Sequence, residues 1–139
     1  MSKKSIKILL IDDDPATIHL HEWIAKKMDT PSEIYTASNG LAAINFLETI
    51  TSDSQMESFL IIFDVNMPVM NGWEFLSAYS NLTVRQGLDF LVLMSSNMRE
   101  DKEKILENNF DFVNICLQKP LKKADFRAIL SQYQQDIMP

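Results

Sequence analysis

Apolar residues in this chain fall into short continuous runs, separated by longer stretches in which they recur at helical spacing. Residues 6–11 are apolar except for one lysine. Such a run is typical of a strand that is covered on both faces. Comparable runs lie at 59–63, 90–94 and 113–117, and a weaker one lies at 33–37. The pattern therefore predicts five strands.

The stretches between these runs carry the signals of helices. Asp14 is a good N-cap and Pro15 fits the first helical turn, after which apolar residues recur at helical spacing to about Met28. Residues 51–58 are polar and serine-rich, which favours a surface loop. Further helices are expected after Asn39-Gly40, after Asn71-Gly72, over 102–108 and over 121–133.

Strands and helices thus alternate five times along the chain. This order implies an α/β fold, with a parallel sheet, right-handed crossovers and helices on both faces. A chain of 139 residues is long enough to bury one substantial core, so we expect a single domain over 1–139 with its core at about 5–135. In sheets of this kind, ligands bind outside the carboxyl ends of the strands.

Composition narrows the class of protein. Apolar residues make up 46% of the chain and charged residues 23%, as in ordinary soluble domains. The net charge of −6 argues against nucleic-acid binding. The single cysteine excludes an internal disulfide and a cysteine-based zinc site. No apolar run approaches the roughly 20 residues that a membrane span needs, so we expect no membrane partner and a cytoplasmic location.

Several polar residues follow the predicted strands directly. Asp12 and Asp13 follow the first strand, Asp64 closes the third, Ser95 follows the fourth and Lys119 follows the fifth. The carboxyl ends of parallel strands lie at one edge of a sheet, so these side chains are expected to converge there. Carboxylates that gather at one place repel each other unless a cation or a proton relieves them. The convergence predicts a site for a divalent cation and a phosphoryl group.

Each of these polar residues could also have a purely structural role. Residues 12–14 could simply cap a helix in solvent, and Asp14 fits that role. Ser95 could cap a helix or stabilise a turn. Asp64 is harder to explain this way, because a carboxylate that closes an apolar strand is partly buried.

The motifs in their order are more specific than any one of them. They are Ile11-Asp12-Asp13, Asp64 with Met67-Pro68 and Gly72, Ser95-Ser96, and Lys119-Pro120. With these motifs the chain resembles the receiver domain of two-component response regulators over nearly its full length. The resemblance implies a flavodoxin-like, doubly wound (βα)5 sandwich whose five-stranded parallel sheet has the order 2-1-3-4-5.

The resemblance also implies the roles of the acidic residues. Asp64 is expected to be the phosphoacceptor. Asp13 and Asp64 are expected to bind Mg²⁺ through their side chains and Asn66 through its backbone carbonyl, while Asp12 acts mainly through ordered water. These oxygen ligands suit Mg²⁺, which prefers an octahedral set of oxygens.

Two more residues complete the expected site. Lys119 is expected to hold the phosphoryl group as a point charge, and the peptide bond to Pro120 to be cis. Ser95 is expected to provide the switch hydroxyl, at a position where threonine is commoner. Cys116 departs from the pattern, because the family usually has tyrosine or phenylalanine there. That ring normally couples the switch hydroxyl to the outer surface, so the departure leaves signal transmission open.

The expected function is that of a stand-alone receiver in a phosphorelay. A sensor histidine kinase or a histidine phosphotransfer protein would donate the phosphoryl group from a phosphohistidine. The chain would be a signalling switch that takes part in its own phosphorylation and dephosphorylation, not an enzyme with an external substrate. An output protein would bind the surface of the last two strands and helices. A fragment of a longer protein stays open as an alternative.

Two other classes of protein fit less well. Phosphohydrolases that resemble haloacid dehalogenases place a second aspartate two residues after the nucleophile, where this chain has Asn66. A flavin-binding module of similar fold needs a phosphate-binding loop after the first strand. Residues 12–14 would instead repel a phosphate there.

Overall fold

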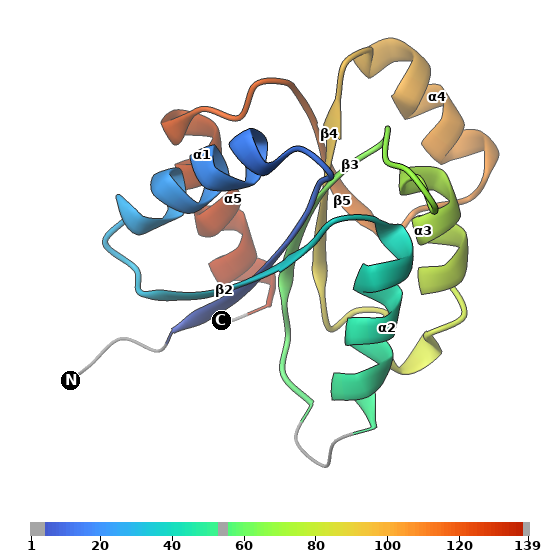
Figure 1. The fold of residues 1–139 in the computed structure, drawn as a ribbon, viewed down its shortest axis with the longest axis horizontal. Coiled ribbons are helices and arrows are strands. Elements are labelled where there is room, and N and C mark those ends of the chain that lie inside the picture. The colour runs from blue at the N-terminus through green and yellow to red at the C-terminus, as the bar shows by residue number, and fades with distance from the viewer. Residues whose placement is uncertain (1–4, 53–55, 138–139) are drawn as a thin grey trace.

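The computed structural model describes residues 5–52 and 56–137. Within them, strands and helices alternate along the chain, as Figure 1 shows. The strands are β1 (Ile6–Ile11), β2 (Ser32–Ala37), β3 (Leu60–Asp64), β4 (Phe90–Ser95) and β5 (Val113–Gln118). The helices are α1 (Pro15–Lys26), α2 (Gly40–Thr51), α3 (Gly72–Tyr79), α4 (Met98–Glu107) and α5 (Lys123–Asp136), with a short 3-10 helix, η1, at Thr83–Arg85.

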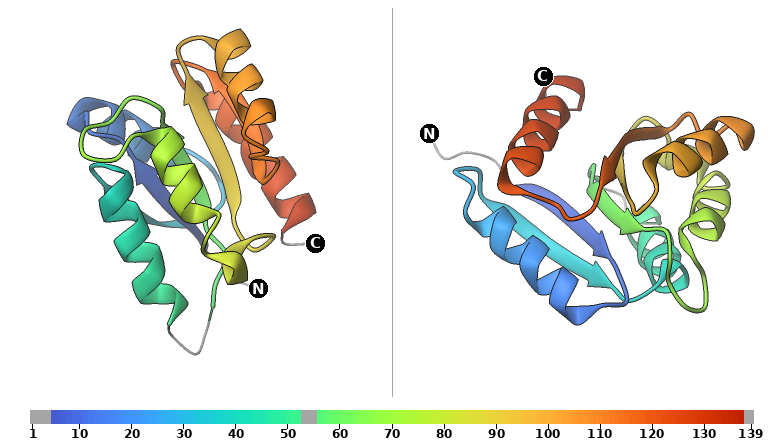
Figure 2. Two further views of the ribbon diagram at one scale, coloured as in Figure 1. Left: turned by 90° about the vertical axis from the view of Figure 1, so that its right-hand side faces the viewer. Right: turned by 90° about the horizontal axis from the view of Figure 1, so that it is seen from above.

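The five strands form one parallel sheet in the order β2-β1-β3-β4-β5. This confirms the predicted fold class and strand order. Helices α1 and α5 cover one face of the sheet, and α2, α3 and α4 cover the other (Figures 1 and 2). The register brings Ile11 opposite Phe63 and Asp64 opposite Met94, so the strands end at nearly the same level.

Alternate side chains of each central strand enter different cores. Leu9 and Ile61 belong to the core beneath α2 and α3, whereas Ile8 and Leu60 belong to the core beneath α1 and α5. All five residues of β3 are buried. Burial on both faces explains why the central strands are continuous apolar runs in the sequence.

Helix α4 begins four residues before the predicted 102–108 stretch. Asn97 caps it, because its side chain accepts a hydrogen bond from the backbone N–H of Glu100 at 3.2 Å. The first turn is mostly polar and so gave no apolar periodicity. Its two acidic residues, Glu100 and Asp101, are nevertheless favourable there, since a helix N-terminus carries partial positive charge.

The other helix boundaries differ from the prediction by smaller amounts. Helix α1 ends at Lys26, not at about Met28. Helix α2 continues to Thr51, at the start of the predicted loop 51–58, and positions 53–55 of that loop lie outside the described residues. Among the described residues, no helix combines the length and the apolar character that crossing a bilayer requires.

Candidate functional site

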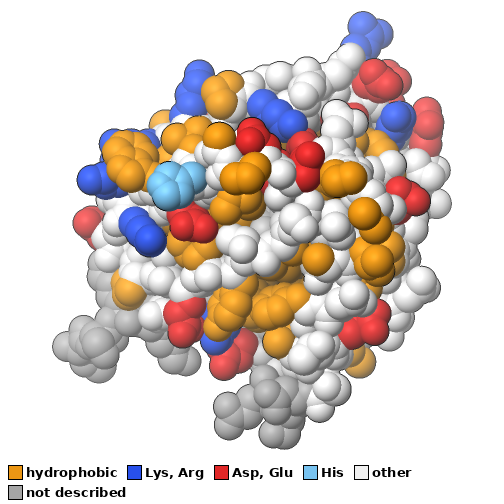
Figure 3. Space-filling view, in the orientation of Figure 1, with side chains coloured by type: hydrophobic (Ala, Val, Ile, Leu, Met, Phe, Trp, Pro, Cys, Tyr) orange, Lys and Arg blue, Asp and Glu red, His pale blue; other side chains and the backbone are white. Residues whose placement is uncertain are grey.

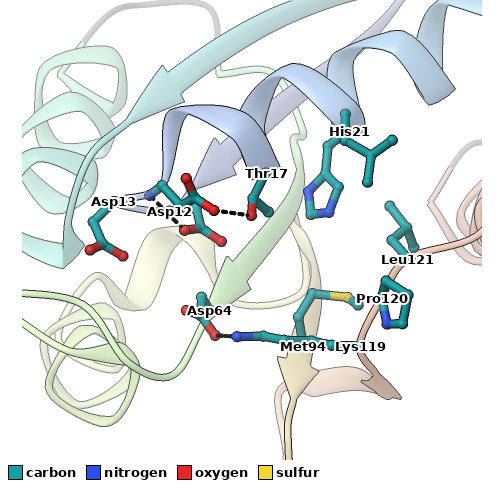
Figure 4. Close-up of a pocket in the computed structure, with 11 residues that line it drawn as sticks. Asp12, Asp13, Thr17, His21, Asp64, Met94, Lys119, Pro120 and Leu121 are labelled. Atoms are coloured by element: carbon teal, nitrogen blue, oxygen red, sulfur yellow. Dashed lines mark hydrogen bonds and ion pairs between the residues drawn. The ribbon is translucent and has the colours of Figure 1, made fainter.

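Three carboxylates meet at the carboxyl end of the sheet. Asp12 and Asp13 follow β1, and Asp64 is the last residue of the neighbouring β3. One oxygen from each of them lies within 4.8 Å of the others. Asp12 and Asp64 are only 8% and 6% exposed, whereas Asp13 is exposed. Figure 4 shows the three side chains around one hollow. The structure therefore brings together the acids that the sequence predicted to converge.

Burial makes the charge of Asp12 costly. Burial is the largest effect that raises the pKa of Asp12, and the negative charges of Asp64 and Asp13 raise it further. The backbone N–H of Asp14, which donates to Oδ1 of Asp12 at 2.9 Å, acts in the opposite direction. A cation among these carboxylates would relieve the repulsion.

Asp14 has the capping role that the sequence suggested. Its Oδ1 accepts from the backbone N–H of Ala16 at 3.1 Å, and its Oδ2 accepts from the hydroxyl of Thr17 at 2.8 Å. These bonds hold Asp14 at the start of α1 and leave Asp12 and Asp13 to face Asp64.

Lys119 follows β5 and reaches Asp64 across the end of β4, the strand between β5 and β3. Its Nζ forms an ion pair with Oδ1 of Asp64, and the backbone N–H of Val65 donates to the same oxygen at 2.9 Å. The two donors fix the orientation of this carboxylate, and Figure 4 shows the ion pair with Lys119. The Lys119–Pro120 peptide bond is cis, as expected. The lysine side chain is one-third exposed.

The loop after β3 is held close to the strand. The backbone N–H of Gly72 donates to the carbonyl of Val65 at 2.8 Å. A Cβ atom at Gly72 would lie 2.8 Å from the backbone oxygen of Asp64, so a larger residue would force the two apart. Asn66 lies in this loop and is exposed, and its part in metal binding stays a prediction.

Ser95 is buried at the end of β4, and its partners lie on the α4 side. Its hydroxyl donates to the carboxylate of Asp101, and it accepts from the backbone N–H of Asn97 at 3.0 Å. Ser95 ends β4 as expected, but Met94, and not Ser95, is among the residues that line the pocket of Asp64 and Lys119. The sequence gave no sign of Asp101. A buried acid on a largely polar helix carries no signal in the hydrophobic pattern.

His21 also lines the pocket and was not anticipated. It projects from α1 toward the hollow, one turn after Thr17, and is 6% exposed. Burial lowers its pKa, and the positive charge of Lys119 lowers it further. The spacing of Asp14, Thr17 and His21 on one side of α1 was the available signal. Around the upper end of the molecule, Figure 3 shows acidic side chains lying close to basic ones.

Comparison with known proteins agrees with this fold. The family model for the response regulator receiver domain matches residues 8–131. The two-component response regulator ARR22 of Arabidopsis thaliana is 31% identical over 133 residues, which are 94% of this chain and 85% of that protein.

Solved structures resemble the chain over almost its whole length. A two-component response regulator from Cytophaga hutchinsonii has a TM-score of 0.82 at 27% identity, covering 95% of this chain and 99% of that one. The receiver domain of the sensor histidine kinase PA1611 from Pseudomonas aeruginosa PAO1, with a magnesium ion coordinated in its active site cleft, has a TM-score of 0.72. It is 20% identical, covers 98% of this chain and 100% of that one, and so shows the shared fold alone. Since the family model spans most of the sequence, this chain belongs to the response regulator receiver domain family.

Proposed function

We propose that this receiver domain accepts a phosphoryl group on Asp64 and thereby switches a surface that binds a partner. Receiver domains are signalling switches of two-component systems, and sensor histidine kinases or phosphotransfer proteins phosphorylate them. The observation that carries the assignment is the environment of Asp64. It is a buried carboxylate that lies beside two other acids and forms an ion pair with Lys119.

The donor set of the acidic cluster fits Mg²⁺, which receiver domains bind in their active site. The clustered groups are hard oxygen ligands, and Mg²⁺ commonly combines one or two carboxylates with water and phosphate oxygens. We assign Asp13 and Asp64 as side-chain ligands, the carbonyl of Asn66 as a backbone ligand, and Asp12 as a ligand through water. When bound, the ion would neutralise negative charge on the phosphoryl oxygens.

The residues of the chain supply orientation and charge for the transfer. An oxygen of Asp64 forms a bond to phosphorus while the bond from phosphorus to the donor histidine nitrogen breaks, and the electron pair stays with that nitrogen. A carboxylate is a weak nucleophile, so the reaction depends on positioning and on neutralised charge. Val65 holds the carboxylate in place through its N–H, and Lys119 moves from Asp64 to a phosphoryl oxygen.

The switch would act through Ser95 and the elements behind it. The hydroxyl of Ser95, which donates to Asp101 in this structure, would have to turn to a phosphoryl oxygen, and the change would spread to α4, β5 and α5. This face carries an exposed apolar side chain, Leu106, which is 77% exposed and available to a partner. We infer that output is the binding of a partner protein, or onward phosphotransfer.

The central chemistry is tested by mass spectrometry after incubation with Mg²⁺ and acetyl phosphate. Wild type should gain the mass of one phosphoryl group, and Asp64→Asn should gain none. Asp111→Asn, a change of the same kind at an exposed position, should react like wild type. Label on Asp64→Asn, or label on a serine of the wild type, would contradict the assignment.

A further inference from the structure

The hollow that contains Asp64 and Lys119 extends well beyond the acidic cluster. Its volume is about 210 Å³. Away from the charged residues it is lined by side chains that are mostly apolar, namely Leu20, His21, Met94, Pro120 and Leu121. Figure 4 shows the aspartates on one side of the hollow and His21, Pro120 and Leu121 on the other. Binding of Mg²⁺ and a phosphoryl group accounts for the acidic side and gives the apolar side no role.

We propose that the apolar side of the hollow is a subsite for the leaving group of a small phosphodonor, an acyl phosphate whose acyl group is apolar and larger than acetyl. The inference rests on the proposed function and deepens it, because it names a substrate class for the same site. An oxygen of Asp64 forms a bond to phosphorus while the bond from phosphorus to the bridging oxygen of the acyl phosphate breaks. The electron pair stays with that oxygen, so a carboxylate ion leaves and no proton has to move.

The direction of the transfer places the acyl group on the apolar side. In phosphoryl transfer the attacking and the leaving oxygen lie roughly in line through phosphorus. The leaving group therefore lies on the side of the phosphoryl group that faces away from Asp64. Within the hollow, His21, Pro120 and Leu121 lie across from the aspartates (Figure 4). An acyl chain that continues the line from Asp64 through phosphorus meets these side chains.

The apolar side is large enough to favour a longer acyl chain over acetyl. The hollow is several times larger than the roughly 30 Å³ that one water molecule occupies in the liquid, so a chain of a few carbons fits. Leu20 is 42% exposed at its edge, and Leu121 is buried at 3% exposure. Apolar groups that leave water for such a surface gain free energy in proportion to the area buried. A single methyl group covers little of it.

His21 gives the apolar side one polar group. The side chain is only 6% exposed, and no hydrogen bond joins its ring to the other residues that line the hollow (Figure 4). Burial and the charge of Lys119 lower its pKa, which favours the neutral ring. A neutral imidazole offers one N–H donor and one acceptor nitrogen. The subsite thus combines an apolar wall with one uncharged group that can bind an acyl oxygen, as ligand sites commonly do.

The first measurement compares butyryl phosphate with acetyl phosphate as donors in the presence of Mg²⁺, with mass spectrometry of the labelled protein. The two donors release carboxylates of similar basicity, so the ratio of their second-order rate constants reports on binding of the chain. Wild type should react about tenfold faster with butyryl phosphate, and Leu20→Ser should reduce this ratio to about threefold. Leu41→Ser is the matched control, because Leu41 is also 42% exposed and lies on α2, away from the hollow. It should keep the ratio of wild type.

The second measurement detects the subsite without any transfer. Acetonylphosphonate and 2-oxopentylphosphonate are unreactive analogues of the two donors, with a methylene group in place of the bridging oxygen. In nuclear magnetic resonance titrations with Mg²⁺, the longer analogue should bind about tenfold more tightly and should shift the methyl signals of Leu20 and Leu121. The methyl signals of Leu41 should not move.

Several results would overturn the subsite. They are a butyryl-to-acetyl ratio near one in wild type, an equal ratio in wild type and Leu20→Ser, and an equal fall of the ratio in Leu41→Ser. Loss of rate in Leu20→Ser with phosphoimidazole but not with butyryl phosphate would show that the hollow takes a donor imidazole instead of an acyl chain. If no donor labels wild type, the proposed function fails, and binding of the two analogues alone decides whether the subsite exists.

Discussion

Burial of the Asp12 carboxyl group next to Asp64 and Asp13 makes its ionised form unfavourable in the folded protein. The raised pKa has a direct consequence for stability. A group whose pKa is higher in the folded state costs stability wherever it is ionised in both states, and that cost disappears as the pH falls to the unfolded value. Without a cation, Asp12 therefore lowers the stability of the protein at neutral pH.

Asp12→Asn should raise the free energy of unfolding at pH 7 in the presence of a chelator. Asparagine keeps an oxygen that can accept from the N–H of Asp14 and removes the charge. The advantage should shrink as the pH falls through the raised native pKa toward the ordinary value of 3.8. Urea unfolding across this pH range measures it. A variant that is less stable than wild type at pH 7, or a gap that widens toward low pH, would show that Asp12 is not destabilising.

Cys116 provides a second prediction at the level of single residues. Its thiol is half-buried and its pKa is raised, by burial first and then by the charge of Asp101. The side chain of Met98 lies against it, so an aromatic residue would have to displace Met98. Cys116→Tyr should lower the free energy of unfolding by about 1–3 kcal/mol, measured by urea denaturation.

Removal of the Met98 side chain provides the control for Cys116→Tyr. Met98→Ala should lower stability on its own, but added to Cys116→Tyr it should recover part of the loss, because it frees the space that the ring needs. If Cys116→Tyr is as stable as wild type, then Met98 does not occupy the space where the family has a ring.

A buried ion pair joins elements at the amino end of the sheet. Arg85 in η1 and Asp89 before β4 are 0% and 4% exposed. The guanidinium group binds the carboxylate twice, from Nε at 2.7 Å and from Nη2 at 2.8 Å. Tyr79 of α3 donates its hydroxyl to Asp89 at 2.9 Å, and the backbone N–H of Phe59 donates to Asp89 at the same distance. Arg85 also donates to the carbonyl of Glu57 at 2.9 Å, which fastens the connection from α2 into β3.

Arg85→Met should lower the free energy of unfolding by about 3–5 kcal/mol, because it leaves the Asp89 carboxylate buried without its charged partner. Arg99→Met, in the exposed pair with Glu103, should change it by less than about 1 kcal/mol. Urea unfolding compares the two. Phosphorylation of the folded variant by acetyl phosphate should be unaffected, since Arg85 lies at the opposite end of the sheet from Asp64. A loss below about 1 kcal/mol for Arg85→Met would mean that the carboxylate finds other partners.

The sequence predicts those elements whose signals are local. Continuous apolar runs mark the central strands because each strand is buried on both faces, and Asp14 and Asn71 mark helix starts because capping involves neighbouring backbone groups. Arg85 and Asp89 gave no such signal, since charged residues in a short connection look solvated until the tertiary structure buries them. The same holds for Asp101, which is buried and accepts a hydrogen bond from Ser95 of another element.

At the scale of the whole molecule, the two ends of the sheet differ in how their buried charges are balanced. The amino end is closed by a neutralised and fully bonded ion pair, which stabilises the fold. The carboxyl end gathers three acids against one lysine, so its charge is not balanced within the cluster itself. Such an arrangement lowers the stability of the free protein and makes it sensitive to cations. The stability of the whole domain should therefore report on the occupancy of one site.

Mg²⁺ should raise the melting temperature of wild type more than that of Asp13→Asn. A ligand that binds only the folded state adds about 1.4 kcal/mol when its free concentration is ten times the Kd, which corresponds to roughly 5 °C for a domain of this size. Asp13→Asn removes one charged ligand, so the gain at the same Mg²⁺ concentration should be smaller. Without Mg²⁺ the variant should melt no lower than wild type, because it has lost a repulsive charge. Asp111→Asn, far in sequence from the cluster and exposed, should retain the full gain. An equal gain in wild type and Asp13→Asn, in melts monitored by circular dichroism, would show that Mg²⁺ does not bind among these acids.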